Sequence, residues 1–344
     1  MLNGKNILIT GGTGSLGKKL VRIILENYKP HKLIILSRDE LKQFEMSQQW
    51  NEKKYPGIRY FLGDVRDKER LMRAFHQVDY VIHAAALKQV PAAEYNPTEF
   101  IQTNVIGAMN IIDAALYNRV KTVIALSTDK ACNPINLYGA TKLCSDKLFT
   151  AANTYSGHEG TCFSVVRYGN VLGSRGSVIP FFKERAKTGV LPITDPRMTR
   201  FWITLDQAVH FVLMALERAK GGEIFVPKIP SMKILDLARA IGPDCRHEMV
   251  GIRPGEKLHE MLIGEDEARN TVEFKNFYVM QSNSKAQDEL LSSGHANTRL
   301  CEDGFCYTSD LNQSWLAVDD LRKLIEQISD DYTIEKSRWA SENI

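Results

Sequence analysis

The residues Asn6-Ile-Leu-Ile-Thr10 run directly into Gly11-Gly-Thr-Gly14-Ser-Leu-Gly17, after which apolar side chains recur at helical spacing as far as Leu25. Residues 6–10, with three aliphatic side chains at their centre, have the length of one buried strand. The glycines that follow permit a sharp turn before a helix. A helix that begins behind such a turn offers backbone N–H groups and the positive end of its dipole to an anion. The stretch therefore predicts a strand, a turn and a helix that hold the pyrophosphate of a dinucleotide.

Short apolar runs alternate with helix-like segments through the first half of the chain. These expected strands are Leu33–Leu36, Ile58–Leu62, Tyr80–His83, Thr122–Ser127 and Cys162–Arg167. Such alternation, with strands that are apolar almost throughout, predicts a doubly wound α/β fold with a parallel, Rossmann-type sheet covered on both faces.

Prolines interrupt this rhythm from about Gly173 onward. We therefore expect a dinucleotide-binding domain over residues 1–172 and a smaller mixed α/β region, mainly for substrate binding, over residues 173–344. Within the second region, residues 281–310 are polar and weakly patterned, and we expect them to form an exposed excursion.

Composition limits the class of protein. The 44 Lys and Arg residues nearly balance the 41 Asp and Glu residues, and 44% of the chain is hydrophobic, which is typical of a folded globular protein rather than a nucleic-acid-binding one. No apolar run reaches the ~18 residues of a membrane span. The six cysteines show neither C-x-x-C nor zinc-ligand spacing, so we expect reduced thiols, no metal and a cytoplasmic location.

The end of the second strand indicates which dinucleotide is bound. A carboxylate there would bind the adenosine ribose, whereas an arginine accommodates a 2′-phosphate. Arg38 follows the strand directly and Asp39 comes one position later. This order favours NADP over NAD, although Arg38 as a solvated surface charge stays an alternative.

Further candidates follow the next strands. Asp64-Val65 could reach the adenine, and the small residues Ala84, Ala85 and Ala86 let the backbone lie against a dinucleotide. We interpret His83 as a packed residue. Lys88 is a candidate for contact with a phosphate or a substrate hydroxyl, with a plain surface charge as the alternative.

The fifth strand ends in Ser127-Thr128-Asp129-Lys130, and Tyr138 and Lys142 follow four residues apart. On a helix these two side chains share a face, where the ammonium could lower the pKa of the phenol and also bind a ribose. A tyrosinate near a nicotinamide is a suitable base for an alcohol that loses hydride. The set predicts an oxidoreductase-type active site.

The residues at this point resemble a known family. The chain is similar to extended short-chain dehydrogenase/reductases that act on nucleotide sugars. The residues that carry this similarity are Gly11–Gly17, Thr103-Asn104, Tyr138 with Lys142, Arg167-Tyr-Gly-Asn170 and Arg253-Pro-Gly-Glu256. A narrower resemblance is to the soluble UDP-N-acetylglucosamine 4,6-dehydratases, the C5-inverting type most closely. It is carried by Ser37–Lys42, Ser127–Ala131, Asn133–Lys142, Met198–Ile203 and Gly251–Glu260. The resemblance is dense to about residue 265.

The resemblance implies a tightly bound NADP that is recycled within each turnover, and a UDP-sugar substrate. It also implies that Tyr138 deprotonates the sugar 4-OH, that Lys130 removes the C5 proton, and that Asp129 protonates the leaving 6-OH. These roles need a lowered pKa at the lysine and a raised one at the aspartate. The plainer alternative is a solvated charge pair on a loop.

The residues and the resemblance together define the expected sites. Members of the cofactor site are Gly11, Thr13, Gly14, Ser15, Leu16, Gly17, Ser37, Arg38, Asp39, Glu40, Lys42, Asp64, Val65, Ala84, Ala85, Ala86, Lys88, Thr103, Tyr138 and Lys142. Members of the substrate site are Lys88, Thr128, Asn170, Ser177, Val178, Arg200, Arg253 and Glu256. Arg253 and Arg200 are expected on the diphosphate, Glu256 on the ribose, Asn170 on a phosphate oxygen and the Ser177–Val178 backbone on the uracil, with Arg175 or Arg197 as alternative arginines.

Other functions stay open. A nucleotide-sugar 4-epimerase or reductase would use the same tyrosine and lysine but leaves Asp129 and Lys130 unexplained. A related dehydratase/5-epimerase of capsule or O-antigen synthesis, or a non-catalytic dinucleotide sensor, is also possible on this fold. We expect a homo-oligomer, either a dimer or a hexamer, with no nucleic acid or membrane as partner.

Overall fold

The computed structural model describes residues 1–157, 160–174, 177–292 and 298–327. The chain divides into two compact units. The first unit contains Met1–Tyr168, Asp206–Lys228 and Met261–Tyr307. The second contains Gly169–Leu205, Ile229–Glu260 and the described residues from Thr308 onward.

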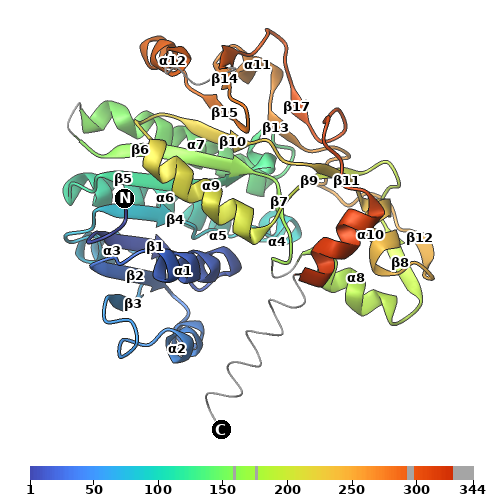
Figure 1. The fold of residues 1–344 in the computed structure, drawn as a ribbon, viewed down its shortest axis with the longest axis horizontal. Coiled ribbons are helices and arrows are strands. Elements are labelled where there is room, and N and C mark those ends of the chain that lie inside the picture. Colours follow the sequence, from blue (N-terminus) through green and yellow to red (C-terminus); the bar gives the residue numbers. More distant parts are fainter. Residues whose placement is uncertain (158–159, 175–176, 293–297, 328–344) are drawn as a thin grey trace. The chain divides into compact units, whose positions relative to one another are not determined.

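A large twisted sheet forms the centre of the first unit (Figure 1). Within the described residues it has ten strands in the order β16-β14-β15-β10-β6-β5-β4-β1-β2-β3. Seven of them run parallel: β3 (Ile58–Leu62), β2 (Lys32–Ser37), β1 (Asn6–Thr10), β4 (Tyr80–His83), β5 (Thr122–Thr128), β6 (Cys162–Tyr168) and β10 (Ile224–Pro227). The direction of winding reverses between β1 and β4, where doubly wound sheets bind ligands at the carboxyl ends of their strands. The doubly wound α/β prediction is confirmed.

Helices cover both faces of this sheet. In Figure 1, α1 (Ser15–Asn27) and α9 (Leu205–Arg218) lie on one side, and α3 (Lys68–Ala74), α6 (Gly107–Tyr117) and α7 (Leu137–Ser156) pack together on the other. The remaining long helix is α2 (Glu40–Gln49). Shorter elements are α4 (Val90–Tyr95), α5 (Pro97–Phe100), the π-helix η1 (Ile101–Ile106) and the 3₁₀-helix η2 (Asp129–Ala131). The strands are buried on both faces, which explains their continuous apolar sequences.

The division of the chain differs from the expected boundary after residue 172. β10 returns to the sheet beside β6, and three antiparallel strands extend the edge: β15 (Phe277–Met280), β14 (Thr271–Glu273) and β16 (Arg299–Leu300). The segment 281–310, expected to be exposed, contributes α12 (Ser284–Leu291) and β16, and it buries Cys301 and Tyr307. Strands of two to four residues carry too little periodicity to be recognised in a polar sequence.

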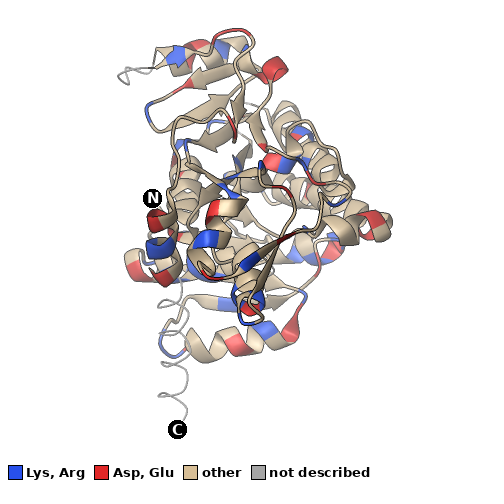
Figure 2. Cartoon of the chain, turned by 90° about the vertical axis from the view of Figure 1, so that its right-hand side faces the viewer, with Lys and Arg blue, Asp and Glu red and all other residues tan. Residues whose placement is uncertain are grey.

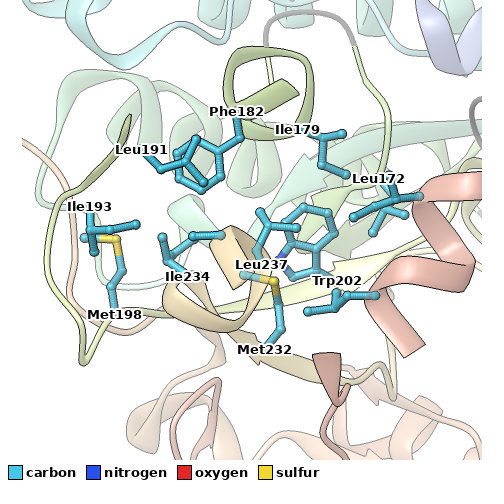
Figure 3. Packing of buried hydrophobic residues seen from close by; sticks show 13 residues of the cluster. Leu172, Ile179, Phe182, Leu191, Ile193, Met198, Trp202, Met232, Ile234 and Leu237 are labelled. Carbon is cyan, nitrogen blue, oxygen red and sulfur yellow. The ribbon is translucent and has the colours of Figure 1, made fainter. Parts of the chain in front are cut away.

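The second unit has a small core of its own. It contains the sheet β11 (Ser231–Lys233), β9 (Thr199–Ile203) and β7 (Asn170–Val171), and the pair β12 (Arg246–Met249) and β8 (Val190–Ile193). Its helices are α8 (Val178–Ala186), α10 (Ile234–Ile241) and a helix over residues 318–327. Figure 3 shows the indole of Trp202 beside Leu237, with Phe182 and Leu191 packed together in the same cluster. This core is separate from that of the large sheet, and it supports the loops that carry the expected substrate residues.

The surface carries charges of both signs. Figure 2 shows Lys and Arg interspersed with Asp and Glu over the coloured part of the chain, in line with the net charge of +3. Among the described residues, a search for a helix both long and apolar enough to span a bilayer found none. The six cysteines all lie in described positions, and none of them forms a disulfide there.

Candidate functional site

The turn after β1 is shaped by close backbone approaches. Gly11 has a φ of +65°, and a Cβ there would lie 2.8 Å from the Cα of Ala85, which follows β4. A Cβ on Gly17 would lie 2.4 Å from the carbonyl oxygen of Gly12. Only glycine fits at either position, so the loops after β1 and β4 meet at the point where the sheet order reverses.

The helix behind this turn has an N-terminus without a side-chain cap. α1 begins at Ser15 with Gly14 as its N-cap, and no acidic residue occupies its first turn. The backbone donors of that turn and the helix dipole therefore suit an anionic group. This cradle fits the pyrophosphate of the dinucleotide that the sequence predicts.

The end of β2 places charged side chains beside the turn. The hydroxyl of Ser37 lies 2.9 Å from that of Thr13. Asp39 is the N-cap of α2, where its carboxylate accepts from the backbone N–H and the ammonium of Lys42, and these hydrogen bonds hold its pKa below the usual value. Arg38 is half exposed and forms an ion pair with Asp64 at 3.6 Å. Asp39 is thus engaged at the end of α2, whereas the Arg38 guanidinium is exposed on its other side.

Asp64 and Val65 follow β3. Burial raises the pKa of Asp64, but hydrogen bonds from Arg66 outweigh burial and hold the pKa below its usual value. Val65 is buried, and its carbonyl oxygen accepts a hydrogen bond from Asn110. The Asp64 carboxylate is thus already bound by Arg66 and Arg38, so it is only partly available for contact with an adenine.

The segment after β4 is fixed from behind by Asn104. Its side chain accepts from the backbone N–H of Leu87 and donates to the carbonyl oxygen of Leu87 and to the hydroxyl of Thr141 on α7. This clamp orients Ala86 and Lys88, which flank Leu87. The adjacent Thr103 is buried, and its hydroxyl has no hydrogen-bond partner among the described residues.

His83 is a packed residue, as its sequence context predicts. Its Nδ1 lies 2.8 Å from the Thr10 hydroxyl and its ring contacts Phe149. Burial lowers its pKa to about 3, with a smaller contribution from the charge of Lys142.

The loop after β5 brings three polar side chains together. The hydroxyl of Thr128 donates to Oδ1 of Asp129 at 2.9 Å, and the Lys130 ammonium donates to the same oxygen at 3.0 Å. The Asp129 side chain is 1% exposed and that of Lys130 is 21% exposed. Asp129 and Lys130 therefore form a largely buried ion pair and not the solvated surface pair considered above.

Tyr138 and Lys142 lie on one face of α7, and both are buried. Burial raises the pKa of Tyr138 to about 12, while the charge of Lys130 and a hydrogen bond with Thr128 act to lower it. Lys142 donates to the carbonyl oxygen of Leu126 at 2.7 Å. The largest contributions that lower the phenol pKa come from Lys130 and Thr128, while the Lys142 ammonium is directed at β5. A lowering by Lys142 stays a prediction.

Lys88 belongs to the same group of charges. Burial lowers the pKa of Lys88, and the nearby positive charge of Lys130 lowers it further. An anionic ligand beside these two lysines would relieve their repulsion.

Six of the expected substrate residues lie in the second unit, whereas Lys88 and Thr128 lie in the first. Arg200 is buried and donates to the carbonyl oxygens of Thr199, Lys257 and Leu258, with Glu260 at 3.6 Å. Its guanidinium thus braces the 257–260 segment. Arg253 is 65% exposed and pairs with Glu256 at 2.5 Å. Of these two arginines, Arg253 has the exposure that binding a diphosphate requires.

The other expected substrate residues are near the start of this unit. Asn170 lies in β7, and its Oδ1 is buried with no hydrogen-bond partner among the described residues. Ser177 precedes α8, whose first residue is Val178. Arg197 pairs with Asp195, and Arg175 lies outside the described residues.

Three charged residues of one network, two of them buried and one partly buried, were not among the expected site residues. Arg167 of β6 is 1% exposed and pairs with Asp146 of α7 at 3.3 Å and with Glu267 of α11 (Glu265–Ala268) at 2.9 Å. Removing one partner of such a buried pair typically costs about 3–5 kcal/mol. The signal in the sequence is an arginine inside an otherwise apolar strand, which requires buried carboxylates from elsewhere in the chain.

The chain is similar to several known proteins over most of its length. The family described as "Polysaccharide biosynthesis protein" matches residues 7–282. A protein of Campylobacter jejuni named UDP-N-acetylglucosamine 4,6-dehydratase (inverting) is 58% identical over 332 residues, which is 94% of this chain and 98% of that protein. A protein of Rickettsia conorii named UDP-glucose 4-epimerase is 39% identical over 350 residues, 99% of this chain and 100% of that protein. The X-ray structure of Pen from Bacillus thuringiensis superposes with a TM-score of 0.86 at 37% identity, covering 95% of this chain and 99% of the other.

Proposed function

The chain belongs to the polysaccharide biosynthesis protein family, and from this premise we propose that it is a UDP-N-acetylglucosamine 4,6-dehydratase of the C5-inverting type. The product would be UDP-2-acetamido-2,6-dideoxy-β-L-arabino-hex-4-ulose. The observation that carries the proposal is the buried Asp129–Lys130 pair beside Thr128 and Tyr138. Oxidation of an alcohol needs only a base such as Tyr138, whereas loss of water needs an additional acid and base.

The cofactor of the proposed enzyme is NADP. The glycine turn and the N-terminus of α1 would hold its pyrophosphate, and Arg38 would contact its 2′-phosphate. When bound, such a nucleotide would supply a hydride acceptor for the C4 hydrogen and a hydride donor for C6. It would stay tightly bound, because each turnover restores its oxidised form.

Tyr138 and Thr128 would act first. Tyr138 removes the proton of the sugar 4-OH as the C4–H bond breaks, which leaves a ketone at C4. Because Lys130 and Thr128 favour the phenolate, they lower the barrier to this proton transfer. Lys142 would bind the ribose next to the base, held there by the Leu126 carbonyl oxygen.

Lys130 and Asp129 would act next. The 4-ketone acidifies the neighbouring C5–H bond. A proton passes from the Lys130 ammonium to the Asp129 carboxylate within the pair, and the neutral Lys130 amine then takes the C5 proton. Asp129 gives a proton to the 6-OH, which leaves as water as the C5–C6 double bond forms. A hydride then adds to C6 and a proton to C5, so the sum of the reaction is the loss of one water with no net oxidation.

The second unit would bind the UDP part of the substrate. We propose Arg253 for the diphosphate, with Glu256 turned to the nucleoside ribose and Asn170 to a phosphate oxygen. The exposure of Arg253 supports its role, and Asn170 would donate to the phosphate oxygen through its amide N–H. The Ser177–Val178 backbone stays the proposed contact for the uracil, and Arg200, which was expected on the diphosphate, would act by bracing the 257–260 segment. A cytoplasmic location, a homo-oligomer and a place in pseudaminic acid synthesis are further predictions.

A nucleotide-sugar 4-epimerase is the second candidate, because the 39% identical relative carries that name. An epimerase returns hydride to C4 and has no use for a buried acid and base next to the tyrosine. The Asp129–Lys130 pair therefore favours the dehydratase.

Proton NMR of the product formed from UDP-N-acetylglucosamine in D₂O tests the proposal. We expect a methyl signal from C6 and deuterium at C5. A 4-epimer without a methyl group would support the second candidate instead. Lys130→Ala should abolish the methyl product, whereas Lys147→Ala, which removes an exposed lysine of α7, should leave it unchanged.

A further inference from the structure

The buried charges around Arg167 form a continuous network inside the first unit. The Arg167 guanidinium donates to both carboxylate oxygens of Glu267, at 3.0 and 2.9 Å, to the carbonyl oxygen of Leu262 at 3.1 Å, and to Oδ2 of Asp146 at 3.3 Å. Arg167 and Asp146 are almost completely buried. Burial raises the pKa of Glu267, but the arginine outweighs burial and keeps the pKa below its usual value. Glu267 is therefore an ionised partner of a buried cation.

One end of the network reaches the loop that carries Asp129 and Lys130. The thiol of Cys132 donates to Oε2 of Glu267 at 3.4 Å, and the backbone N–H of Gly264 donates to the same oxygen at 3.0 Å. Cys132 is the residue that ends η2, and its backbone N–H donates to the carbonyl oxygen of Asp129. Through Cys132, Glu267 thus contacts the C-terminal end of the turn that carries Asp129 and Lys130.

The other end of the network reaches the helix that carries Tyr138 and Lys142. Asp146 lies one turn beyond Lys142 on α7 and accepts from the hydroxyl of Ser127, the residue before Thr128, at 2.8 Å. The charges of Asp146 and Lys142 also act on each other's pKa. Asp146 thereby ties α7 to the end of β5.

We propose that Glu267, acting through Cys132, is a positioning residue for the dehydration step. Through this contact it fixes the Asp129–Lys130 turn relative to Tyr138. At the other end of the network, Arg167 and Asp146 hold the helix that carries Tyr138. This inference rests on the proposed function, since it assigns to Glu267 a part in water loss and none in the initial oxidation. Tyr138 and Lys142 keep their places on α7 without Glu267, whereas the turn after β5 loses a fixed contact at Cys132. Deprotonation of C5 and departure of the 6-OH are then the steps that slow.

Three variants test this inference. Cys132→Ala removes the contact between the turn and Glu267 and leaves the ion pairs of Arg167 in place. Glu267→Gln keeps the shape but takes away the charge. Asp266→Asn, on the same short helix, is the matched control, because the Asp266 side chain is fully exposed. Cys132→Ala decides the question if Glu267→Gln does not fold.

The first measurement separates oxidation from water loss. Holoenzyme mixed with UDP-N-acetylglucosamine is followed at 340 nm for bound reduced nucleotide, and the methyl product is quantified by NMR. We expect Cys132→Ala and Glu267→Gln to lower the rate of product formation at least tenfold while reduced nucleotide accumulates, and Asp266→Asn to match the wild type. An equal fall of both signals, or an unchanged product rate in Cys132→Ala, would overturn the inference.

The second measurement does not depend on activity. Amide hydrogen exchange should become faster at residues 129–132 in Cys132→Ala and Glu267→Gln and stay unchanged in Asp266→Asn. Unchanged protection in Cys132→Ala would contradict the proposed contact. If the wild type forms no product but these exchange rates change as expected, the proposed function fails and the positioning of the turn by Glu267 stands.

Discussion

The turn after β1 and the turn after β5 both follow the carboxyl ends of central strands of one sheet. They differ in whether backbone groups or side-chain charges form them. The first is made of backbone: Gly11 and Gly17 allow close approaches, and the end of α1 supplies its donors. The second is made of buried side-chain charges, with Asp129, Lys130 and Tyr138 in contact with or close to one another. The backbone-built turn depends on positions that have room for glycine alone, whereas the charge-built turn depends on ionised partners, which through Cys132 include Glu267 from far along the chain.

The largest effect is expected from Tyr138→Phe, which alters only the charge-built turn. Loss of the base should lower turnover by about 10³-fold, since general bases contribute 10²–10⁴-fold, while nucleotide binding is retained. The rate is measured by NMR of the product. Tyr155→Phe is the control, because Tyr155 is an exposed residue of the same helix. Turnover within tenfold of the wild type would show that the phenol is not the base.

Gly11→Ala alters only the backbone-built turn. The positive φ and the 2.8 Å approach to Ala85 together should cost about 3 kcal/mol of unfolding free energy, by strain and overpacking, and weaken nucleotide binding. Urea unfolding and nucleotide titration measure the two effects. Gly157→Ala is the control: its φ is +69°, but no atom lies within 4 Å of the added Cβ, so about 1 kcal/mol is expected. Equal losses in the two variants would contradict a close approach at Gly11.

His83, which is buried between Thr10 of β1 and Phe149 of α7, predicts a pH effect on stability. Its pKa is about 3 in the folded chain and about 6.5 in the unfolded chain, so between these values only the unfolded chain binds a proton at this residue. The contribution is present above pH 6.5 and is lost as the pH falls toward 3, which amounts to about 2 kcal/mol at pH 5. Urea unfolding at pH 7 and pH 5 measures it. The loss should be about 2 kcal/mol smaller in His83→Gln than in the exposed-site control His76→Gln. A loss of the same size in both variants would show that His83 is not buried in its neutral form.

The smallest effect is expected from Arg38→Glu, at the outer end of the backbone-built turn. The ratio of NADP to NAD affinity should fall about tenfold, which corresponds to about 1.4 kcal/mol, because a partly exposed charge contact is weak. Titration with each nucleotide measures the ratio. Arg73→Glu, an exposed change on α3, should leave it unaltered. An unchanged ratio in Arg38→Glu would remove the basis for preferring NADP.

The same contrast explains what the sequence could predict. The strands Ile58–Leu62 and Tyr80–His83 have the predicted bounds, and the glycine turn and the shared face of Tyr138 and Lys142 follow from spacing alone. These features depend on local patterns of two or 3.6 residues. Spacing could not show that the Lys142 ammonium is directed at Leu126, because that depends on how α7 packs against β5.

Features made by distant segments were missed for the same reason. Arg200 was expected on a diphosphate, yet it braces carbonyl oxygens of residues 257 and 258. The partners of Arg167 at positions 146 and 267 come from segments on either side of it in the chain. The return of residues 206–228 and 261–307 to the first unit is likewise a property of the sheet and not of any local stretch. Long-range pairing leaves no period in the sequence.

The central claim is that the charge-built turn converts an oxidation at C4 into a dehydration with return of the same hydride. UDP-N-acetylglucosamine that carries deuterium on C4 tests this claim most directly, with NMR of the product as the measurement. We expect the deuterium on the C6 methyl group of the product. Deuterium that stays on C4, or that is lost to water, would contradict it.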